Sequence, residues 1–182
     1  MTTVAVFVGS LRKESFSRKI ANAITSLTPS LTFDFLDIGA VSYFNQDLEA
    51  HPPADWTALR KRIAAADAVL FVTAEYNRSM PGVLKNAMDV ASRPYGKGAL
   101  LGKPAAIIST SIGAIGGFGA NHHLRQSLCF LNMPTMEQPE AYIGGTGSLF
   151  DDAGQLTNDG TRDFLVSFGK AFEQHIAHNA KR

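Results

Sequence analysis

The chain has 182 residues, of which 45% are hydrophobic and 18% are charged, and this balance excludes a disordered or highly charged protein. Its 17 Lys and Arg residues oppose 16 Asp and Glu residues, and the formal net charge of +1 argues against a partner held by bulk electrostatics, such as duplex DNA or an anionic membrane. The single cysteine, Cys129, excludes an internal disulfide framework and a site in which several cysteines hold zinc or an iron–sulfur cluster.

The first part of the chain alternates short apolar runs with a helical pattern. Residues 4–8 are continuously apolar and rich in β-branched side chains, which predicts a strand buried on both faces. A helix is predicted over 17–27, where apolar side chains recur at helical spacing, and a second strand over 31–36. Residues 39–53 are predicted to form a long loop that contains the aromatic pair Tyr43-Phe44.

The same alternation continues to the end of the chain. Asp55 is expected to cap a helix over 56–66, and a buried strand follows over 68–73. Pro81 is expected to open the next helix, because a proline at the first helical position loses no hydrogen bond. The further predicted elements are strands over 105–110 and within 133–143, and helices over 81–91, 120–131 and 158–178.

This order of elements predicts an α/β fold with a parallel sheet and helices on both of its faces. Five strands in this length favour a flavodoxin-like doubly wound sheet of order 2-1-3-4-5 over a larger Rossmann domain. We expect residues 1–182 to form one domain. The N-terminus has no secretory pattern and no apolar run approaches the ~20 residues of a membrane span, so we expect a cytoplasmic protein.

Ligands of such sheets bind at the carboxyl ends of the strands, so the loops after the first, third and fourth strands are the informative segments. The first loop offers the hydroxyls of Ser10, Ser15 and Ser17 and the guanidinium of Arg12 at the start of a helix, which suits a phosphate. It is neither a Walker A loop nor a Gly-x-Gly-x-x-Gly loop. The alternative is a polar turn with a serine cap.

The other two loops suit a flat ring. Residues 74–80 carry donors, acceptors and an aromatic ring, although an ordinary turn between a strand and a helix has the same composition. Residues 111–119 contain four glycines within 113–119, which would let the backbone approach a planar ligand or would simply form a flexible turn. Together the three loops predict a site for a phosphorylated flavin, FMN.

Two stretches resemble the NADPH-dependent FMN reductase family, which includes chromate, azo and quinone reductases of flavodoxin-like fold. The resemblance is carried by Gly9-Ser10-Leu11-Arg12-Lys13-x-Ser15-Phe16-Ser17 and by Glu75-Tyr76-Asn77-Arg78-Ser79-x-Pro81-Gly82 with its continuation Leu84-Lys85-Asn86-Ala87-x-Asp89. Ala74 stands where many relatives have proline, and Ser17-Arg18 where many have asparagine. The resemblance implies bound FMN, hydride acceptance from NADH or NADPH, and a homodimer or homotetramer.

On this resemblance we expect a set of cofactor contacts. Arg12 with the three serines would hold the phosphate, and Lys13 and Arg18 would be surface charges. Arg78 and Arg93 are further candidates for contacts with the nucleotide, the acceptor or a partner subunit, although Arg93 is equally well explained as a helix-end charge. The expected cofactor-binding residues are Ser10, Arg12, Ser15, Ser17, Glu75, Tyr76, Asn77, Arg78, Ser111, Gly113, Gly116 and Gly117.

The predicted reaction is a ping-pong transfer of hydride from NAD(P)H to FMN, followed by two-electron reduction of a quinone, an azo compound, a ferric chelate or chromate. A non-enzymatic electron carrier of flavodoxin type is the alternative, but such carriers are acidic and this chain is near neutral. A receiver-like signalling module would need clustered carboxylates after the first strand, where this chain has Ser, Arg and Lys.

The histidines do not predict a metal site. His122 and His123 are adjacent and therefore point in different directions from a helix, and His175 and His178 have no nearby third ligand at a suitable spacing. We expect Cys129 to be buried and inert on an apolar helix face.

Overall fold

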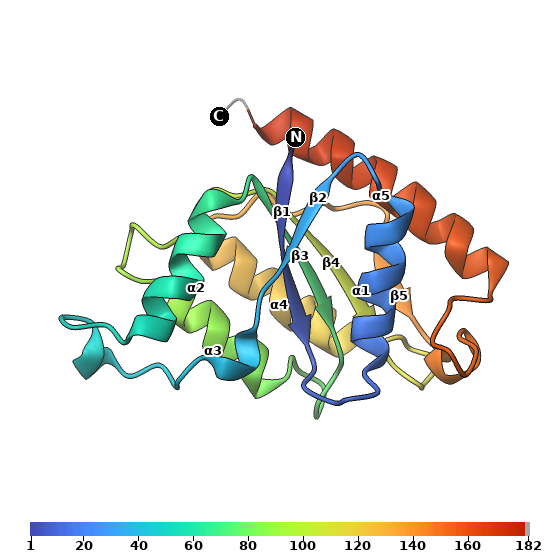
Figure 1. Cartoon of the computed structure of the whole chain (residues 1–182), viewed down its shortest axis with the longest axis horizontal. Helices are drawn as coiled ribbons and strands as arrows, with labels where there is room; N and C mark the ends of the chain where they lie inside the picture. Colours follow the sequence, from blue (N-terminus) through green and yellow to red (C-terminus); the bar gives the residue numbers. More distant parts are fainter. Residues whose placement is uncertain (181–182) are drawn as a thin grey trace.

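A computed structural model describes residues 1–180 and contains one five-stranded sheet (Figure 1). Every strand pairs in parallel with its neighbours, in the order β2-β1-β3-β4-β5, which confirms the predicted flavodoxin-like topology. The strands are β1 (Thr3–Gly9), β2 (Thr32–Phe35), β3 (Ala68–Thr73), β4 (Ala105–Thr110) and β5 (Ala141–Ile143).

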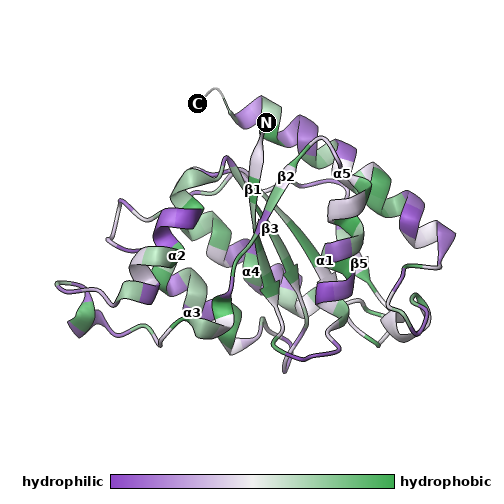
Figure 2. Ribbon diagram, in the orientation of Figure 1, coloured by the Kyte–Doolittle hydropathy of each residue, from purple (hydrophilic) through white to green (hydrophobic). Residues whose placement is uncertain are grey.

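Helices cover both faces of this sheet (Figure 1). The helices are α1 (Phe16–Leu27), α2 (Ala54–Ala65), α3 (Gly82–Ala91), α4 (Phe118–Phe130) and α5 (Asp159–Asn179), and short 3-10 turns are η1 (Ile38–Ala40), η2 (Gln46–Leu48) and η3 (Thr146–Ser148). Figure 2 shows hydrophobic residues concentrated in the strands and hydrophilic ones on the outer sides of the helices. Among the helices within residues 1–180, none has the length and apolarity that crossing a membrane requires.

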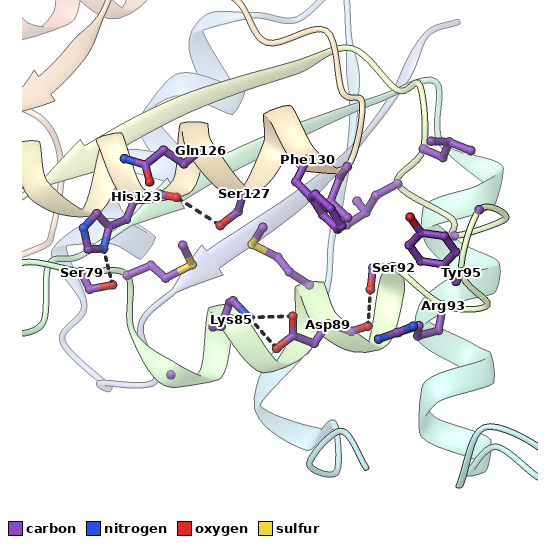
Figure 3. Close-up of a pocket in the computed structure, with 18 residues that line it drawn as sticks. Ser79, Lys85, Asp89, Ser92, Arg93, Tyr95, His123, Gln126, Ser127 and Phe130 are labelled. Atoms are coloured by element: carbon purple, nitrogen blue, oxygen red, sulfur yellow. Dashed lines mark hydrogen bonds and ion pairs between the residues drawn. The ribbon is translucent and has the colours of Figure 1, made fainter. Parts of the chain in front are cut away.

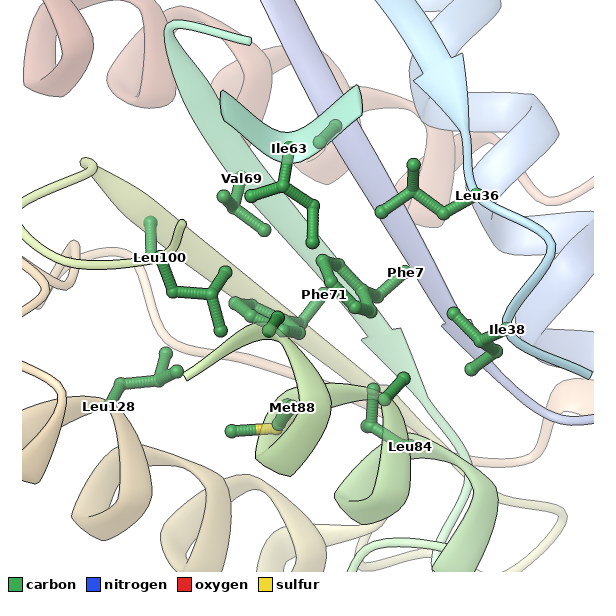
Figure 4. Close-up of a cluster of buried hydrophobic side chains, with 14 of the residues drawn as sticks. Phe7, Leu36, Ile38, Ile63, Val69, Phe71, Leu84, Met88, Leu100 and Leu128 are labelled. Carbon is green, nitrogen blue, oxygen red and sulfur yellow. The ribbon is translucent and has the colours of Figure 1, made fainter. Parts of the chain in front are cut away.

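The central strands are buried on both faces, as their unbroken apolar sequences predict. One hydrophobic cluster packs α1 and α5 against the sheet, with Ile20 and Phe168 among its buried members. The other packs α2, α3 and α4 against the opposite face, where Phe7 and Phe71 stack at 5.0 Å between ring centroids (Figure 4). Helices thus pack against both faces of the sheet, and the loops at its carboxyl edge extend from a rigid core.

The structure corrects three of the local predictions, and in one of them Pro81 is the N-cap residue of α3 and not its first residue. Pro53, and not Asp55, is the N-cap residue of α2, and the carboxylate of Asp55 instead accepts hydrogen bonds from the amide (2.6 Å) and hydroxyl (2.7 Å) of Ser42. These bonds hold the pKa of Asp55 below its usual range. Cys129 is exposed on α4, so its predicted burial is wrong. The predicted loop 39–53 contains η2 and begins within η1.

Candidate functional site

Three loops meet at the carboxyl edge of the sheet. The strand register places Gly9 of β1 beside Thr73 of β3, and Thr73 beside Ser109 of β4. The loops that follow these strands therefore start side by side, as the fold requires of a ligand site in a doubly wound sheet. Each loop leads directly to the N-terminus of a helix, α1, α3 or α4.

The loop after β1 ends in a helix N-terminus with free donors. Ser15 is the N-cap residue of α1, and its hydroxyl accepts a hydrogen bond from the amide of Arg18 at 3.2 Å. The amides of Phe16 and Ser17 have no acceptor within residues 1–180. Uncapped first-turn amides together with the helix dipole favour an anion, and this arrangement therefore fits the phosphate of FMN.

The charged side chains of this loop differ in their surroundings. Arg12 and Lys13 are exposed, and the Arg12 amide lies 3.4 Å from the hydroxyl of Ser10. Arg18 is half-buried, with its guanidinium 4.9 Å from the ring centroid of Phe35. Burial lowers the pKa of Arg18, although the group stays charged at neutral pH because its ordinary value is so high. Arg18, predicted as a surface charge, is therefore only partly exposed and packs its guanidinium against Phe35.

The loop after β3 is a tight hairpin. Tyr76 and Ser79 exchange both backbone hydrogen bonds, at 2.9 and 3.0 Å, and the residues between them, Asn77 and Arg78, have φ of 52° and 64°. Positive φ at both central positions defines a type I′ turn. Tyr76 is about half exposed and Asn77 and Arg78 are exposed, so this turn presents its side chains to the open edge of the sheet.

Glu75 ties this hairpin to the start of α4. Its Oε2 accepts a hydrogen bond from the amide of Ala120 at 3.0 Å, and its Oε1 lies 3.5 Å from Nη1 of Arg78. The N-cap residue of α4 is Gly117, which has no side chain to cap the helix. Glu75 therefore supplies the missing cap from another loop, a role that the sequence analysis missed because the two residues lie far apart in the chain.

We expect Glu75→Ala to lower stability by about 1–2 kcal/mol, the usual contribution of a helix cap, and the melting temperature by about 3–6 °C. Because the two loops would also lose their connection, the affinity for riboflavin should fall. Glu75→Gln retains an oxygen acceptor and should keep most of both properties. Thermal melts and flavin titrations of the two variants measure these effects. A Glu75→Ala protein with the melting temperature of the parent would show that the cap does not contribute to stability.

The loop after β4 begins with a local turn. The hydroxyl of Ser111 accepts a hydrogen bond from the amide of Gly113 at 3.1 Å, and Gly113 is exposed. A Cβ on Gly113 would meet only this hydroxyl, at 3.6 Å. Ser111 and Gly113 thus remain accessible for the cofactor contacts predicted for them.

Gly116 and Gly117 have a conformational role. Their φ values are +63° and +77°, and both residues are buried. A Cβ on Gly116 would lie 2.4 Å from the carbonyl carbon of Tyr142, and one on Gly117 would lie 3.1 Å from Cβ of Ser109. A side chain at either position would therefore push against β5 or β4, so packing and backbone conformation already require glycine here, and the predicted contact with a flat ring could come only from the backbone.

Arg93 is held within its own subunit. Its Nε lies 3.4 Å from Oε1 of Glu49, and its guanidinium is 5.2 Å from the ring centroid of Phe44. Phe44 in turn stacks on Trp56 at 5.5 Å, while Tyr43 remains 84% exposed. Arg93 thus fastens the segment 39–53 to the end of α3, and of the aromatic pair only Tyr43 is free to contact another molecule.

A groove of about 980 Å³ lies between α3 and α4 (Figure 3). It begins at the hairpin, where His123 Nδ1 and Ser79 Oγ lie 3.0 Å apart, and continues past the Lys85–Asp89 ion pair on α3. At its far end the ring of Phe130 is 77% exposed. The groove therefore extends away from the carboxyl edge along the helices.

Two further histidines, His122 and His175, have contacts within the fold. His122 Nε2 lies 3.0 Å from the hydroxyl of Tyr142, and burial, reinforced by Glu140, raises the pKa of Tyr142 to about 12. His175 Nε2 lies 2.8 Å from the carbonyl oxygen of Pro134. Within the part of the chain that the structure describes, no three His, Cys, Asp or Glu residues gather as metal ligands would.

Comparison with known proteins identifies relatives over nearly the whole chain. The family described as NADPH-dependent FMN reductase matches residues 2–147. A quinone reductase of Pseudomonas putida is 58% identical over 97% of this chain and 96% of its own length, and a 2-hydroxy-1,4-benzoquinone reductase of a Burkholderia species is 49% identical over 91% of each chain. A solved flavoenzyme NAD(P)H:(acceptor) oxidoreductase from Paracoccus denitrificans superposes with a TM-score of 0.92 at 42% identity, covering 98% of this chain and 99% of that one.

Proposed function

We propose a reaction for this chain from one premise: it belongs to the NADPH-dependent FMN reductase family. The reaction is the two-electron reduction of a quinone by NAD(P)H, in which quinone, NAD(P)H and a proton give hydroquinone and NAD(P)⁺. When bound, FMN supplies an isoalloxazine that accepts a hydride from the nicotinamide and passes two electrons to the acceptor. The near-complete alignment with quinone reductases is the observation that carries this proposal.

The residues at the carboxyl edge fit this cofactor. The first turn of α1 offers free amides and the neighbouring Arg12 a guanidinium, so we propose that they bind the FMN phosphate together with Ser10, Ser15 and Ser17. We propose that the hairpin after β3, through Glu75, Tyr76, Asn77 and Arg78, and the turn after β4, through Ser111, Gly113, Gly116 and Gly117, border the isoalloxazine. Contacts from the two buried glycines would be made by their backbone.

Quinones are the acceptors that the relatives' names support, and hydroxyquinones are included because one relative is a 2-hydroxy-1,4-benzoquinone reductase. We propose azo compounds, ferric chelates and chromate as further acceptors, which would take electrons from the same reduced flavin in one two-electron step or in successive steps. We also propose that residues 1–182 act as one FMN-binding domain in the cytoplasm, where nicotinamide dinucleotides are available in reduced form.

Steady-state kinetics test this function. FMN-loaded protein should sustain many turnovers of NADH or NADPH when a benzoquinone is present, and double-reciprocal plots at several quinone concentrations should give parallel lines, because the dinucleotide leaves before the acceptor binds. Intersecting lines would contradict the ping-pong order. Slow or absent turnover by a flavin-loaded protein would favour the alternative of a flavodoxin-type electron carrier.

We propose that the groove between α3 and α4 is the interface of a homodimer. Phe130 and Tyr95 at its end are 77% and 76% exposed and Leu101 is 47% exposed, and apolar side chains gathered in this way mark an interaction surface. A second copy can place the same groove and the same aromatic rings opposite the first, as a two-fold interface requires. The groove begins at Ser79, so this interface would reach the flavin site.

Phe130→Asp is expected to convert the dimer into a monomer, because the substitution places a charge among the exposed apolar side chains at the end of the groove. The monomer should remain folded, since this ring is exposed within the protomer. Sedimentation velocity at micromolar concentration measures the change. Gln174→Asp, on the exposed side of α5, adds the same single negative charge outside the groove and should stay dimeric. A parent protein that is monomeric and fully active would contradict the proposed interface.

A further inference from the structure

We infer that Arg78 is a specificity-determining residue that binds a phosphate of the nicotinamide dinucleotide. This inference rests on the proposed function, and it assigns to one side chain the recognition of the reductant. The evidence is the conformation of the residue, the exposure of its guanidinium and its separation from the cation predicted to hold the FMN phosphate.

The backbone at Arg78 is unfavourable for a long side chain. It occupies the second central position of a type I′ turn with φ of 64°, a position at which glycine is strongly preferred. The turn itself is closed by the paired bonds between Tyr76 and Ser79, and these bonds involve no side chain of Arg78. An arginine retained in the left-handed region, where it does not contribute to the turn, points to a function of its side chain.

The guanidinium is available for a ligand. Its side chain is 74% exposed, and its only ion-pair partner within residues 1–180 is Glu75, at 3.5 Å. The other oxygen of that carboxylate is engaged by the amide of Ala120, and the side chain of Glu75 is only 15% exposed. Glu75 therefore holds the guanidinium at Nη1, while its outward-facing donors remain open to two oxygens of a phosphate, which the fork of arginine donors matches.

Two arginines stand on two different loops at this edge. Arg12 precedes α1, where the FMN phosphate is proposed to bind, whereas Arg78 is at the tip of the hairpin after β3. A second anionic ligand must enter the same site in every turnover, because the nicotinamide dinucleotide carries a pyrophosphate and NADPH a further phosphate. Quinone acceptors need not be charged. The position of Arg78 therefore favours the dinucleotide over the acceptor.

Arg78→Gly tests the inference, because it removes the guanidinium and relieves the backbone strain. We expect an unchanged or higher melting temperature together with an about tenfold weaker equilibrium affinity for NADP⁺, measured by calorimetry on the FMN-loaded protein. The Kd for NADPH in stopped-flow bleaching of the flavin absorbance should rise by the same factor. Arg78→Lys should recover part of the affinity. Salt should weaken NADP⁺ binding to the parent more than to Arg78→Gly.

Asn132→Gly is the matched control, since Asn132 has a φ of 52° and is exposed at the end of α4, beside the amino end of the sheet. It relieves strain without touching the site, and its NADP⁺ affinity should equal that of the parent. An equal loss for NADH and NADPH assigns Arg78 to the pyrophosphate, and a larger loss for NADPH assigns it to the 2′-phosphate.

Three results would overturn the inference. Unchanged NADP⁺ affinity in Arg78→Gly would show that the side chain does not bind the dinucleotide. A parallel loss of melting temperature and affinity would make Arg78 structural. A loss confined to flavin reoxidation by an ionised hydroxyquinone would assign the residue to the acceptor. If NADPH does not bleach the flavin absorbance of the parent protein, the proposed function itself is wrong. Failure of the proposed function is therefore distinguishable from failure of the inference about Arg78.

Discussion

Gly116→Ala is expected to lower the melting temperature by about 10 °C or more. The new Cβ would lie 2.4 Å from the carbonyl carbon of Tyr142 and 2.7 Å from the amide nitrogen of Ile143, and both atoms belong to the backbone of β5. The residue also has φ of +63°, which alanine adopts at a cost. Overpacking against a backbone together with this strain costs about 3 kcal/mol or more, and each kcal/mol shifts the melting temperature of a protein of this size by about 2–4 °C.

Gly113→Ala is the matched control for this effect, because it lies in the same loop, is exposed, and would meet only a hydroxyl at 3.6 Å. Its melting temperature should stay within about 2 °C of the parent's. Scanning calorimetry of both variants in the presence and absence of FMN separates a structural effect from a cofactor effect. A Gly116→Ala protein with the parent's stability but no flavin affinity would contradict the packing against β5 and restore a direct role toward the ring.

The centre of the sheet could be predicted from the sequence because β3 and β4 begin with uninterrupted apolar runs. The predicted ranges 68–73 and 105–110 coincide with these two strands, which are buried along their whole length and turn polar only at their carboxyl ends. The order of the strands followed from the alternation with helices. The fifth strand was placed only within 133–143, since β5 is a short strand at the edge of the sheet and carries little pattern.

The contacts between loops could not be predicted in this way. Asp55 satisfies the composition of a helix cap, but its carboxylate bonds to Ser42 and the N-cap residue of α2 is Pro53. Glu75 was predicted only as a cofactor contact, and its hydrogen bond with the amide of Ala120 on α4 was not foreseen. Local sequence patterns carry no information on such distant partners. The role of Gly116 was likewise hidden, because the backbone that it contacts comes from β5.

Arg12→Ala is expected to weaken FMN binding about ten- to a hundredfold. The reason is that a charge-assisted hydrogen bond to a phosphate contributes roughly 1.5–3 kcal/mol. Arg12 is exposed, and within residues 1–180 no carboxylate forms an ion pair with it. Its removal should therefore leave the melting temperature of the flavin-free protein unchanged, which separates this variant from Gly116→Ala. Fluorescence titration of the flavin-free protein gives the dissociation constants.

Riboflavin provides the internal control, because it has the same ring and no phosphate. Its affinity should be nearly equal for the parent and for Arg12→Ala, so that the two proteins differ only for FMN. Lys13→Ala removes the neighbouring exposed cation and should change FMN affinity by about twofold at most, since a solvated charge acts only at long range and is screened by salt. An equal loss of FMN and riboflavin affinity in Arg12→Ala would place this arginine near the ring. An effect of Lys13→Ala as large as that of Arg12→Ala would show that the loop attracts the phosphate by its total charge and not by the directed donors of one guanidinium.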